Sequence, residues 1–164
     1  MLKKIPTIVI LLASSISVLA QTKIHPSPDK SLRAVIIPVG NKGYESEESR
    51  VEIRTPYRKV LRWRSFASPD GQHGGGVHHA EWSLDGQFFI FNVFSSGGHQ
   101  PWHVATYFYI RRNNKFYSLD AFIGPITSDF KLQGRNTVVA TRFNFDRNEE
   151  KEPVKVRLQN LRAM

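Results

Sequence analysis

The sequence AEWSLDGQFFIFNVF, residues 80–94, decides the fold of this chain. Its second half, Gln87–Phe94, has apolar residues on both faces and is rich in aromatic and β-branched residues, a pattern typical of a strand buried on both faces. The preceding tetrapeptide, Ser83–Gly86, predicts a tight turn, because its aspartate can accept a backbone N–H and its glycine can take a positive φ. We therefore expect Ala80–Trp82 and Phe88–Ile90 to pair as antiparallel neighbours. The side chains expected in the core are Trp82, Phe89 and Phe91.

Short apolar or alternating segments recur on both sides of this stretch. Gly, Pro and Asn interrupt the sequence about every eight to twelve residues, and no segment combines helical periodicity with capping residues. The sequence therefore predicts an all-β chain with no helix beyond the N-terminal segment, a polar lead-in over 21–30, and polar or charged loops over 40–49 and 147–152. The expected strands are 31–39, 50–55, 59–64, 80–83, 87–94, 105–112, 115–119, 130–133, 137–145 and 154–161.

A threefold repeat relates these strands. A turn sequence precedes an apolar strand at Ser27–Lys30, at Ser83–Gln87 and at Gln133–Asn136, and each apolar strand is followed by more charged ones. Ser68–Gly71 has the same Ser-Pro-Asp type of turn sequence without an obvious strand after it. The spacing predicts three similar β units along one chain.

The segment Ala80–Phe91 resembles the blade motif of TolB-like β-propellers, in which a Trp-Ser-Pro-Asp-Gly turn leads into a buried strand. Leu84 stands here at the place of the motif's proline. The resemblance extends over residues 78–120 and is weaker over 27–64. It implies about three propeller-blade-like antiparallel sheets. Since propellers close with four to eight blades, the chain would form an incomplete propeller, self-associate to complete one, or form an open β-sandwich.

The first twenty residues predict export. Lys3 and Lys4 give a positively charged start, an apolar segment follows, and Val18–Ala20 matches a small-residue cleavage site. The apolar segment is shorter than the roughly 20 residues that span a bilayer, which favours a signal peptide (1–20) over a membrane anchor. The mature chain, 21–164, is then expected to be a single all-β domain, periplasmic or secreted, without a membrane span.

Composition limits the partners of such a domain. The chain has no cysteine, so burial of its apolar residues must stabilise it without disulfides. Its 23 Lys and Arg against 14 Asp and Glu give a net charge of +9, which suits either an anionic cell-envelope partner or a solvated basic surface. Export argues against nucleic acid as a partner, and no glycine-rich loop leads into a helix that would bind a nucleotide phosphate.

Two polar, glycine-rich segments flank the apolar strand, residues 71–79 and 95–103. If Ser83–Gly86 is a turn, both segments lie at the same end of the sheet and form one patch, which is the best candidate for binding a partner or ligand. The glycines are expected to let the chain pass closely over Trp82 and Trp102. The candidate binding residues are His73, His78, His79, His99, Trp102 and His103.

The same residues allow two functional interpretations. We expect a non-enzymatic domain without a cofactor: His73–Gly76 matches the oxyanion-hole tetrapeptide of lipases and esterases, but the chain lacks their Gly-x-Ser-x-Gly elbow. Such a domain would bind a protein or a cell-envelope partner. The alternative is a metal-binding protein or metal-dependent enzyme, because neutral imidazoles on loops bind Zn²⁺, Cu²⁺ or Ni²⁺. Its metal ligands would be His78, His79, His99 and His103.

Overall fold

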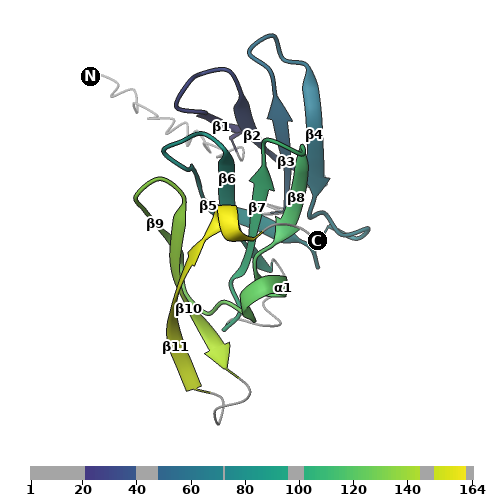
Figure 1. Cartoon of the computed structure of the whole chain (residues 1–164). Helices are drawn as coiled ribbons and strands as arrows, with labels where there is room; N and C mark the ends of the chain where they lie inside the picture. Colours follow the sequence, from purple (N-terminus) through teal and green to yellow (C-terminus); the bar gives the residue numbers. More distant parts are fainter. Residues whose placement is uncertain (1–20, 40–47, 72, 96–101, 145–149, 162–164) are drawn as a thin grey trace, which may run out of the picture.

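The computed structural model describes residues 21–39, 48–71, 73–95, 102–144 and 150–161 (Figure 1). These residues form three antiparallel sheets, in which strands consecutive in the chain lie side by side. The first sheet contains β1 (Lys23–Pro26), β2 (Arg33–Pro38), β3 (Ser49–Arg54) and β4 (Val60–Ser65). The central sheet contains β5 (Gly75–Trp82), β6 (Phe88–Ser95), β7 (Ala105–Ile110) and β8 (Lys115–Ser118). The third sheet contains β9 (Lys131–Gln133), β10 (Thr137–Asn144) and β11 (Glu150–Arg157), with β10 in the middle.

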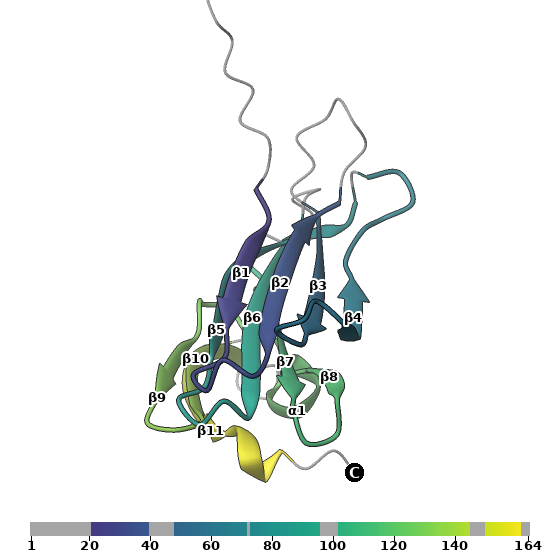
Figure 2. The same cartoon turned by 90° about the horizontal axis from the view of Figure 1, so that it is seen from above.

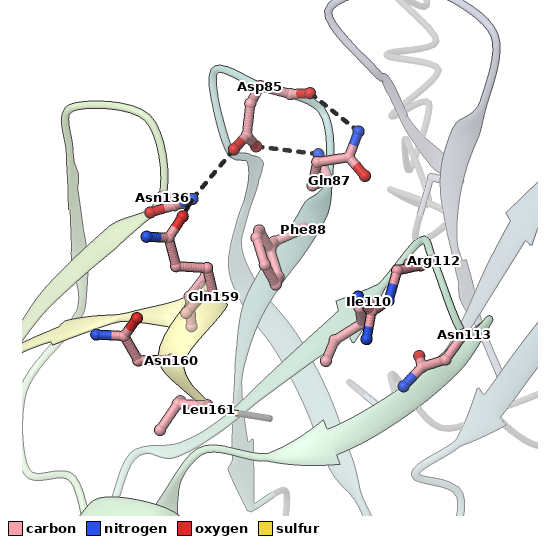
Figure 3. A pocket seen from close by; sticks show the side chains of 11 residues that line it. Asp85, Gln87, Phe88, Ile110, Arg112, Asn113, Asn136, Gln159, Asn160 and Leu161 are labelled. Carbon is pink, nitrogen blue, oxygen red and sulfur yellow. Dashed lines mark hydrogen bonds between the residues drawn. The ribbon is translucent and has the colours of Figure 1, made fainter. Parts of the chain in front are cut away.

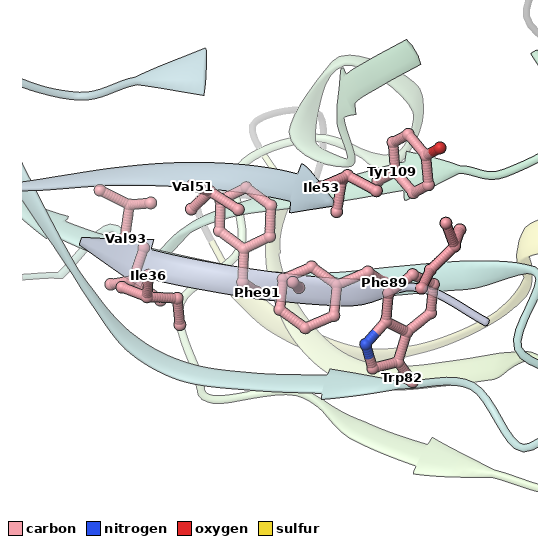
Figure 4. Close-up of a cluster of buried hydrophobic side chains, with 11 residues drawn as sticks. Ile36, Val51, Ile53, Trp82, Phe89, Phe91, Val93 and Tyr109 are labelled. Carbon is pink, nitrogen blue, oxygen red and sulfur yellow. The ribbon is translucent and has the colours of Figure 1, made fainter. Parts of the chain in front are cut away.

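The central sheet lies between the other two, so both faces of β6 are buried (Figure 2). Phe89, Phe91 and Val93 point to one core, which they share with Ile36, Val51 and Ile53 of the first sheet (Figure 4). Phe88 and Ile90 belong to a second core, shared with the third sheet and with the segment that links β8 to β9. The side chains of Phe89 and Phe91 are 0% exposed and that of Trp82 is 9% exposed. The prediction of a strand buried on both faces is therefore confirmed.

Two of the three turn sequences of the predicted repeat, those before β6 and β2, form the same turn. Before β6, the Ser83 hydroxyl donates to Asp85 Oδ1 at 2.6 Å and accepts the N–H of Phe88 at 3.1 Å. Before β2, the Ser27 hydroxyl makes the same bond to Asp29 Oδ1, also at 2.6 Å. Serine and aspartate two residues apart satisfy each other and the backbone of the next strand, which is why the turn can be recognised in the sequence. The turn at Ser83–Gly86 and the antiparallel pairing after it are as predicted, but the partners of Ala80–Trp82 are Phe89–Phe91, one residue further along than the predicted Phe88–Ile90.

Ser68–Gly71 forms a third copy of this turn. The Ser68 hydroxyl donates to Asp70 Oδ1 at 2.7 Å and accepts the N–H of His73 at 3.1 Å. It connects β4 of the first sheet to β5 of the central sheet. The strand that the sequence did not show after it is β5, which begins at Gly75 and not at Ala80. Most of the expected loop 71–79 is therefore strand.

Two edge strands also differ from the prediction. Lys23–Pro26, expected as a lead-in, is β1 and pairs with β2 along one side only. Residues 150–152, expected as part of a charged loop, belong to β11, which pairs with β10 from Asn144 to Thr137. Proline and alternating charges are compatible with an edge strand, because one side of its backbone needs no ladder partner. Polar composition therefore does not distinguish an edge strand from a loop.

Two short helices depart from the expected all-strand chain. One helical turn, α1 (Asp120–Ile123), follows β8, and a 3₁₀ turn, η1 (Leu158–Asn160), ends β11, where the sequence predicted strand up to residue 161. Ile123 of α1 and Leu158 of η1 pack in the second core. Neither described helix has the length and hydropathy needed to cross a membrane. The described residues thus form three stacked antiparallel sheets without a closed barrel, an arrangement that fits an incomplete propeller or an open sandwich.

Candidate functional site

Glu48, directly before β3, fixes the segment that leads into β5. Its carboxylate is 0% exposed and accepts hydrogen bonds from the Ser68 hydroxyl at 2.6 Å, from Ser68 N at 3.0 Å and from Gly74 N at 2.6 Å. Burial alone would raise the pKa of the Glu48 carboxyl, but these hydrogen bonds hold the pKa below its usual value of 4.5. A buried carboxylate thus positions the backbone on which His73 lies.

Positions 74 and 75 accommodate only glycine, because neighbouring atoms lie where the Cβ of any other residue would be. A Cβ at Gly74 would lie 2.5 Å from the Glu48 carboxylate, and a Cβ at Gly75 would come closer than 3.0 Å to a methyl group of Val93. Real Cβ atoms essentially never show such separations. The atoms nearest to an added Cβ at these two positions belong to Glu48, Phe66, Val93 and Phe94, and the expectation that the glycines pass over Trp82 and Trp102 stays a prediction.

These close contacts leave a small hollow at the end of β6, which we call the histidine hollow. Its volume is about 260 Å³. It receives His73 from the segment before β6 and His103 from the segment after it, so these two predicted residues do converge. Trp102, next to His103, is 42% exposed, and its ring contacts the rings of His103 and Phe143. The residues that line the hollow are Phe66, His73, Gly74, Gly75, Val93, Ser95, His103 and Ala105.

A carboxylate orients each imidazole of the hollow. His73 Nδ1 contacts the Asp70 carboxylate, so the third copy of the turn also positions this ring. His103 Nε2 lies 3.3 Å from Asp120 Oδ1. The same carboxylate of Asp120 accepts backbone N–H groups of Thr106 at 3.1 Å and Ile126 at 2.8 Å. Hydrogen-bonded carboxylates of this kind fix ring orientation, so the hollow presents two oriented imidazoles.

His78 and His79 lie outside this hollow. The pairing of β5 with β6 shifts between Val77 and Ala80, so both histidines face Asn92 across a β-bulge. His79 N donates to Asn92 Oδ1 at 2.8 Å, which satisfies a backbone group that the bulge removes from the ladder. The two histidines of the bulge differ in exposure: His78 is exposed, whereas His79 is partly buried.

His79 links the central sheet to the third sheet. Its ring stacks on Phe130, with centroids 4.4 Å apart and planes 9° apart. Its Nδ1 lies 2.8 Å from Asp129 Oδ1, an oxygen that also accepts from Asn92 Nδ2 at 2.6 Å and from Phe130 N at 2.9 Å. Asn92 is 0% exposed, so this network satisfies a buried amide. The structure therefore gives His79 a packing role between the two sheets, and its predicted role in binding stays a prediction.

The predicted metal ligands do not meet in the described part of the chain. His78 and His79 lie on the bulge and His103 lies in the histidine hollow. Within residues 21–39, 48–71, 73–95, 102–144 and 150–161, no three His, Cys, Asp or Glu side chains are placed to hold a metal ion. His99 and Gly97, whose distance from His79 would measure the convergence of the two segments, lie outside the described residues.

A second, larger hollow lies at the opposite end of β6, beside Phe88 (Figure 3). Its volume is about 770 Å³, and η1 forms one of its sides. The sequence does not predict this hollow, because the residues that form it are expected in a plain strand and in turns. A cluster of carboxamides in those turns and in Leu158–Leu161 is the only sequence signal for it that we find.

Comparisons with known proteins do not name a family. No protein-family model and no curated protein matches the sequence. Among solved structures, a chain from a study entitled "Structural and Mechanistic Analysis of Two Prolyl Endopeptidases: Role of Inter-Domain Dynamics in Catalysis and Specificity" is similar, with 14% sequence identity and a TM-score of 0.45. The match covers 83% of this chain and 18% of that chain. A likeness this distant carries no argument about function.

Proposed function

We propose that this protein is an exported, non-enzymatic β domain that binds a protein or a cell-envelope partner through the histidine hollow. The observation that carries the proposal is the convergence of His73 and His103, from the two segments that flank β6, on one hollow. Exposed polar segments on a rigid strand are where binding sites are concentrated.

The size of the hollow favours a macromolecular partner over a free small molecule. Ligand pockets usually enclose about 300–1,000 Å³, and the histidine hollow has about 260 Å³. It would hold one projecting group of a larger partner. The exposed Trp102 beside it supplies apolar surface of the kind that contributes strongly to interfaces.

The preformed backbone also supports binding. Glu48 fixes Gly74, and the carboxylates of Asp70 and Asp120 orient the two imidazoles. A surface that is already ordered loses little conformational entropy when a partner binds.

Photo-crosslinking in the producing cells tests this proposal. A chain with p-benzoylphenylalanine in place of Trp102 should form a covalent adduct of higher mass on irradiation. The same residue in place of Trp63, which is 59% exposed on the first sheet, is the matched control and should give none. Adding His73→Ala to the first variant should remove the adduct. No adduct from position 102, or equal adducts from both positions, would refute the proposed site.

Export is tested separately by the N-terminus of the protein isolated from those cells. We expect the mature chain to begin at Gln21, because Val18–Ala20 matches a cleavage site. A chain that still begins at Met1 would contradict cleavage.

A further inference from the structure

The larger hollow combines an apolar floor with a polar rim, and we call it the carboxamide cleft (Figure 3). Phe88 and Leu158 are buried beneath it, at 6% and 0% exposure. Figure 3 shows Asn136, Gln159 and Asn160 on one side of Phe88 and Arg112 and Asn113 on the other. The floor is formed by Phe88, Ile110, Leu158 and Leu161.

The one carboxylate that lines the cleft is already used by the fold. Asp85 Oδ1 accepts from the Ser83 hydroxyl at 2.6 Å and from Gln87 N at 3.1 Å, and Asp85 Oδ2 accepts from Asn136 Nδ2 at 3.1 Å. These bonds hold the turn before β6 and join it to the turn before β10. Asp85 therefore has little capacity left for a ligand.

Two polar groups of the cleft have no such role. Within the described part of the chain, neither the Arg112 guanidinium nor the Asn160 carboxamide takes part in a hydrogen bond or an ion pair. By contrast, Arg111, which precedes Arg112 in the sequence, forms an ion pair with Asp29, with Nη1 2.8 Å from Oδ2. The cleft thus offers one uncompensated positive charge, a side-chain amide and an apolar floor in a volume of about 770 Å³.

We propose that the carboxamide cleft binds the C-terminal end of a peptide. The terminal carboxylate pairs with Arg112, because a guanidinium binds a carboxylate through two parallel hydrogen bonds. An apolar terminal side chain occupies the floor over Phe88 and Leu158. The carboxamide of Asn160 donates to and accepts from the peptide backbone, whose amides have the same donor and acceptor groups.

The floor favours a peptide over a neutral sugar. A bound apolar residue would remove from water the partly exposed surface of Ile110 and Leu161, which contributes roughly 25 cal/mol per Å² of apolar surface buried. A neutral sugar would offer Arg112 hydroxyl oxygens as acceptors but no anionic group for a charge-assisted pair. Capture of a C-terminal carboxylate is a recurrent mode of peptide recognition.

A titration followed by NMR tests the proposal on residues 21–164. The probe is acetyl-glycyl-alanyl-leucine with a free carboxylate, and the side-chain amide signals of Asn113 and Asn160 report binding. We expect saturable shifts of both signals. The same peptide as its C-terminal amide, and the variant Arg112→Gln with the free acid, should each raise Kd by about tenfold or more, the effect of losing one charge-assisted pair.

The matched control is Lys151→Gln, which removes one positive charge from an exposed side chain at the far end of β11. Its Kd for the free acid should be unchanged. Equal affinity for the acid and the amide, or an unchanged Kd in Arg112→Gln, would overturn the proposal. So would the absence of saturation at about 10 mM peptide, beyond the millimolar range of weak specific binding. A neutral disaccharide that shifts these signals when the peptide does not would identify a sugar site instead.

Discussion

The two ends of β6 are built in different ways. At the end with Val93 and Ser95, Gly74 and Gly75 line part of the histidine hollow, and their backbone is held close to Phe66, Val93 and the buried Glu48. At the end that begins with Phe88, the carboxamide cleft has exposed side chains around an apolar floor. The two sites at the ends of β6 therefore differ: the contacts that shape the histidine hollow also stabilise the fold, whereas the rim of the carboxamide cleft consists of exposed side chains.

This difference has a general consequence for substitutions. Where the walls are backbone, a change that alters the site also alters the folding free energy, because the same contacts serve both. Where the walls are exposed side chains, such as Arg112 and Asn160, binding can change with little effect on stability. The predictions below separate the two cases.

The largest effect is expected in β6 itself, which supports both ends. Phe91→Ala should lower the free energy of unfolding by about 3–5 kcal/mol, the usual cost of a large aromatic cavity in a core, because Phe91 is 0% exposed. Urea unfolding followed by tryptophan fluorescence measures it. The control Tyr57→Ala, at a side chain that is 94% exposed, should stay within about 0.5 kcal/mol. A loss below 1 kcal/mol for Phe91→Ala would show that β6 is not central.

Gly74→Ala tests the backbone walls of the histidine hollow. We expect a loss of roughly 3 kcal/mol, the upper part of the range for overpacking, because the added methyl group would meet the Glu48 carboxylate at 2.5 Å and the backbone of Phe66. The matched control is Gly134→Ala, in the turn before β10. No atom lies within 4 Å of its added Cβ, and its φ of 59° accounts for a loss of only about 1 kcal/mol. Equal losses at the two glycines would contradict the close approach at Gly74.

Low pH should destabilise the protein through Glu48, which lies at the end of β6 with the histidine hollow. Because the folded protein holds the pKa of Glu48 below 4.5, this carboxylate contributes stability that is present above pH 4.5 and is lost as the pH falls through the folded pKa. Asp29, whose pKa is also lowered by hydrogen bonds from Ser27, Arg111 and Ser31, contributes to the same acid loss. The free energy of unfolding is measured at a series of pH values for the parent and for Glu48→Gln. The difference between the two pH profiles is the contribution of the Glu48 carboxylate. If the free energy of unfolding fell equally in both proteins below pH 5, the stabilising role of the Glu48 carboxylate would be contradicted.

Much of the fold follows from local sequence patterns. The apolar residues of Phe88–Phe94, interrupted by Asn92 alone, and the Ser-x-Asp turns before β2 and β6 predict the central strand and the repeat, because both depend on neighbouring residues only. The bounds of β1, β5 and β11 are not predictable in this way. Their pairing depends on partners elsewhere in the sheet, and an edge strand tolerates the polar residues of a loop.

The candidate site was predictable in part for a similar reason. The turn at Ser83–Gly86 brings the two flanking segments to one end of the central sheet, so the meeting of His73 and His103 follows from topology. The β-bulge opposite Asn92 does not follow from it, and this bulge turns His79 toward Phe130. A one-residue shift in register changes the face on which a side chain lies, and no signal in the sequence predicts the shift.

The smallest effect is expected from divalent metal ions. Asp70, Asp129 and Asp120 hold the rings of His73, His79 and His103 at separate places, which does not favour shared coordination. We therefore expect calorimetric titration of residues 21–164 with Zn²⁺, Cu²⁺ or Ni²⁺ to show no tight stoichiometric binding. One-to-one binding that His103→Ala abolishes would support the metal-binding alternative.

The difference between the two ends of β6 is tested most directly by amide hydrogen exchange, measured residue by residue. Gly74 N donates to Glu48 at 2.6 Å and Gly75 N donates to Phe66 O at 2.8 Å, whereas Asn113 lies in the exposed hairpin turn between β7 and β8. We predict that the amides of Gly74 and Gly75 exchange only through global unfolding, as those of Phe89 and Phe91 do, and that the amide of Asn113 exchanges through local opening. Exchange of Gly74 and Gly75 as fast as that of Asn113 would show that the histidine hollow is not part of the fold.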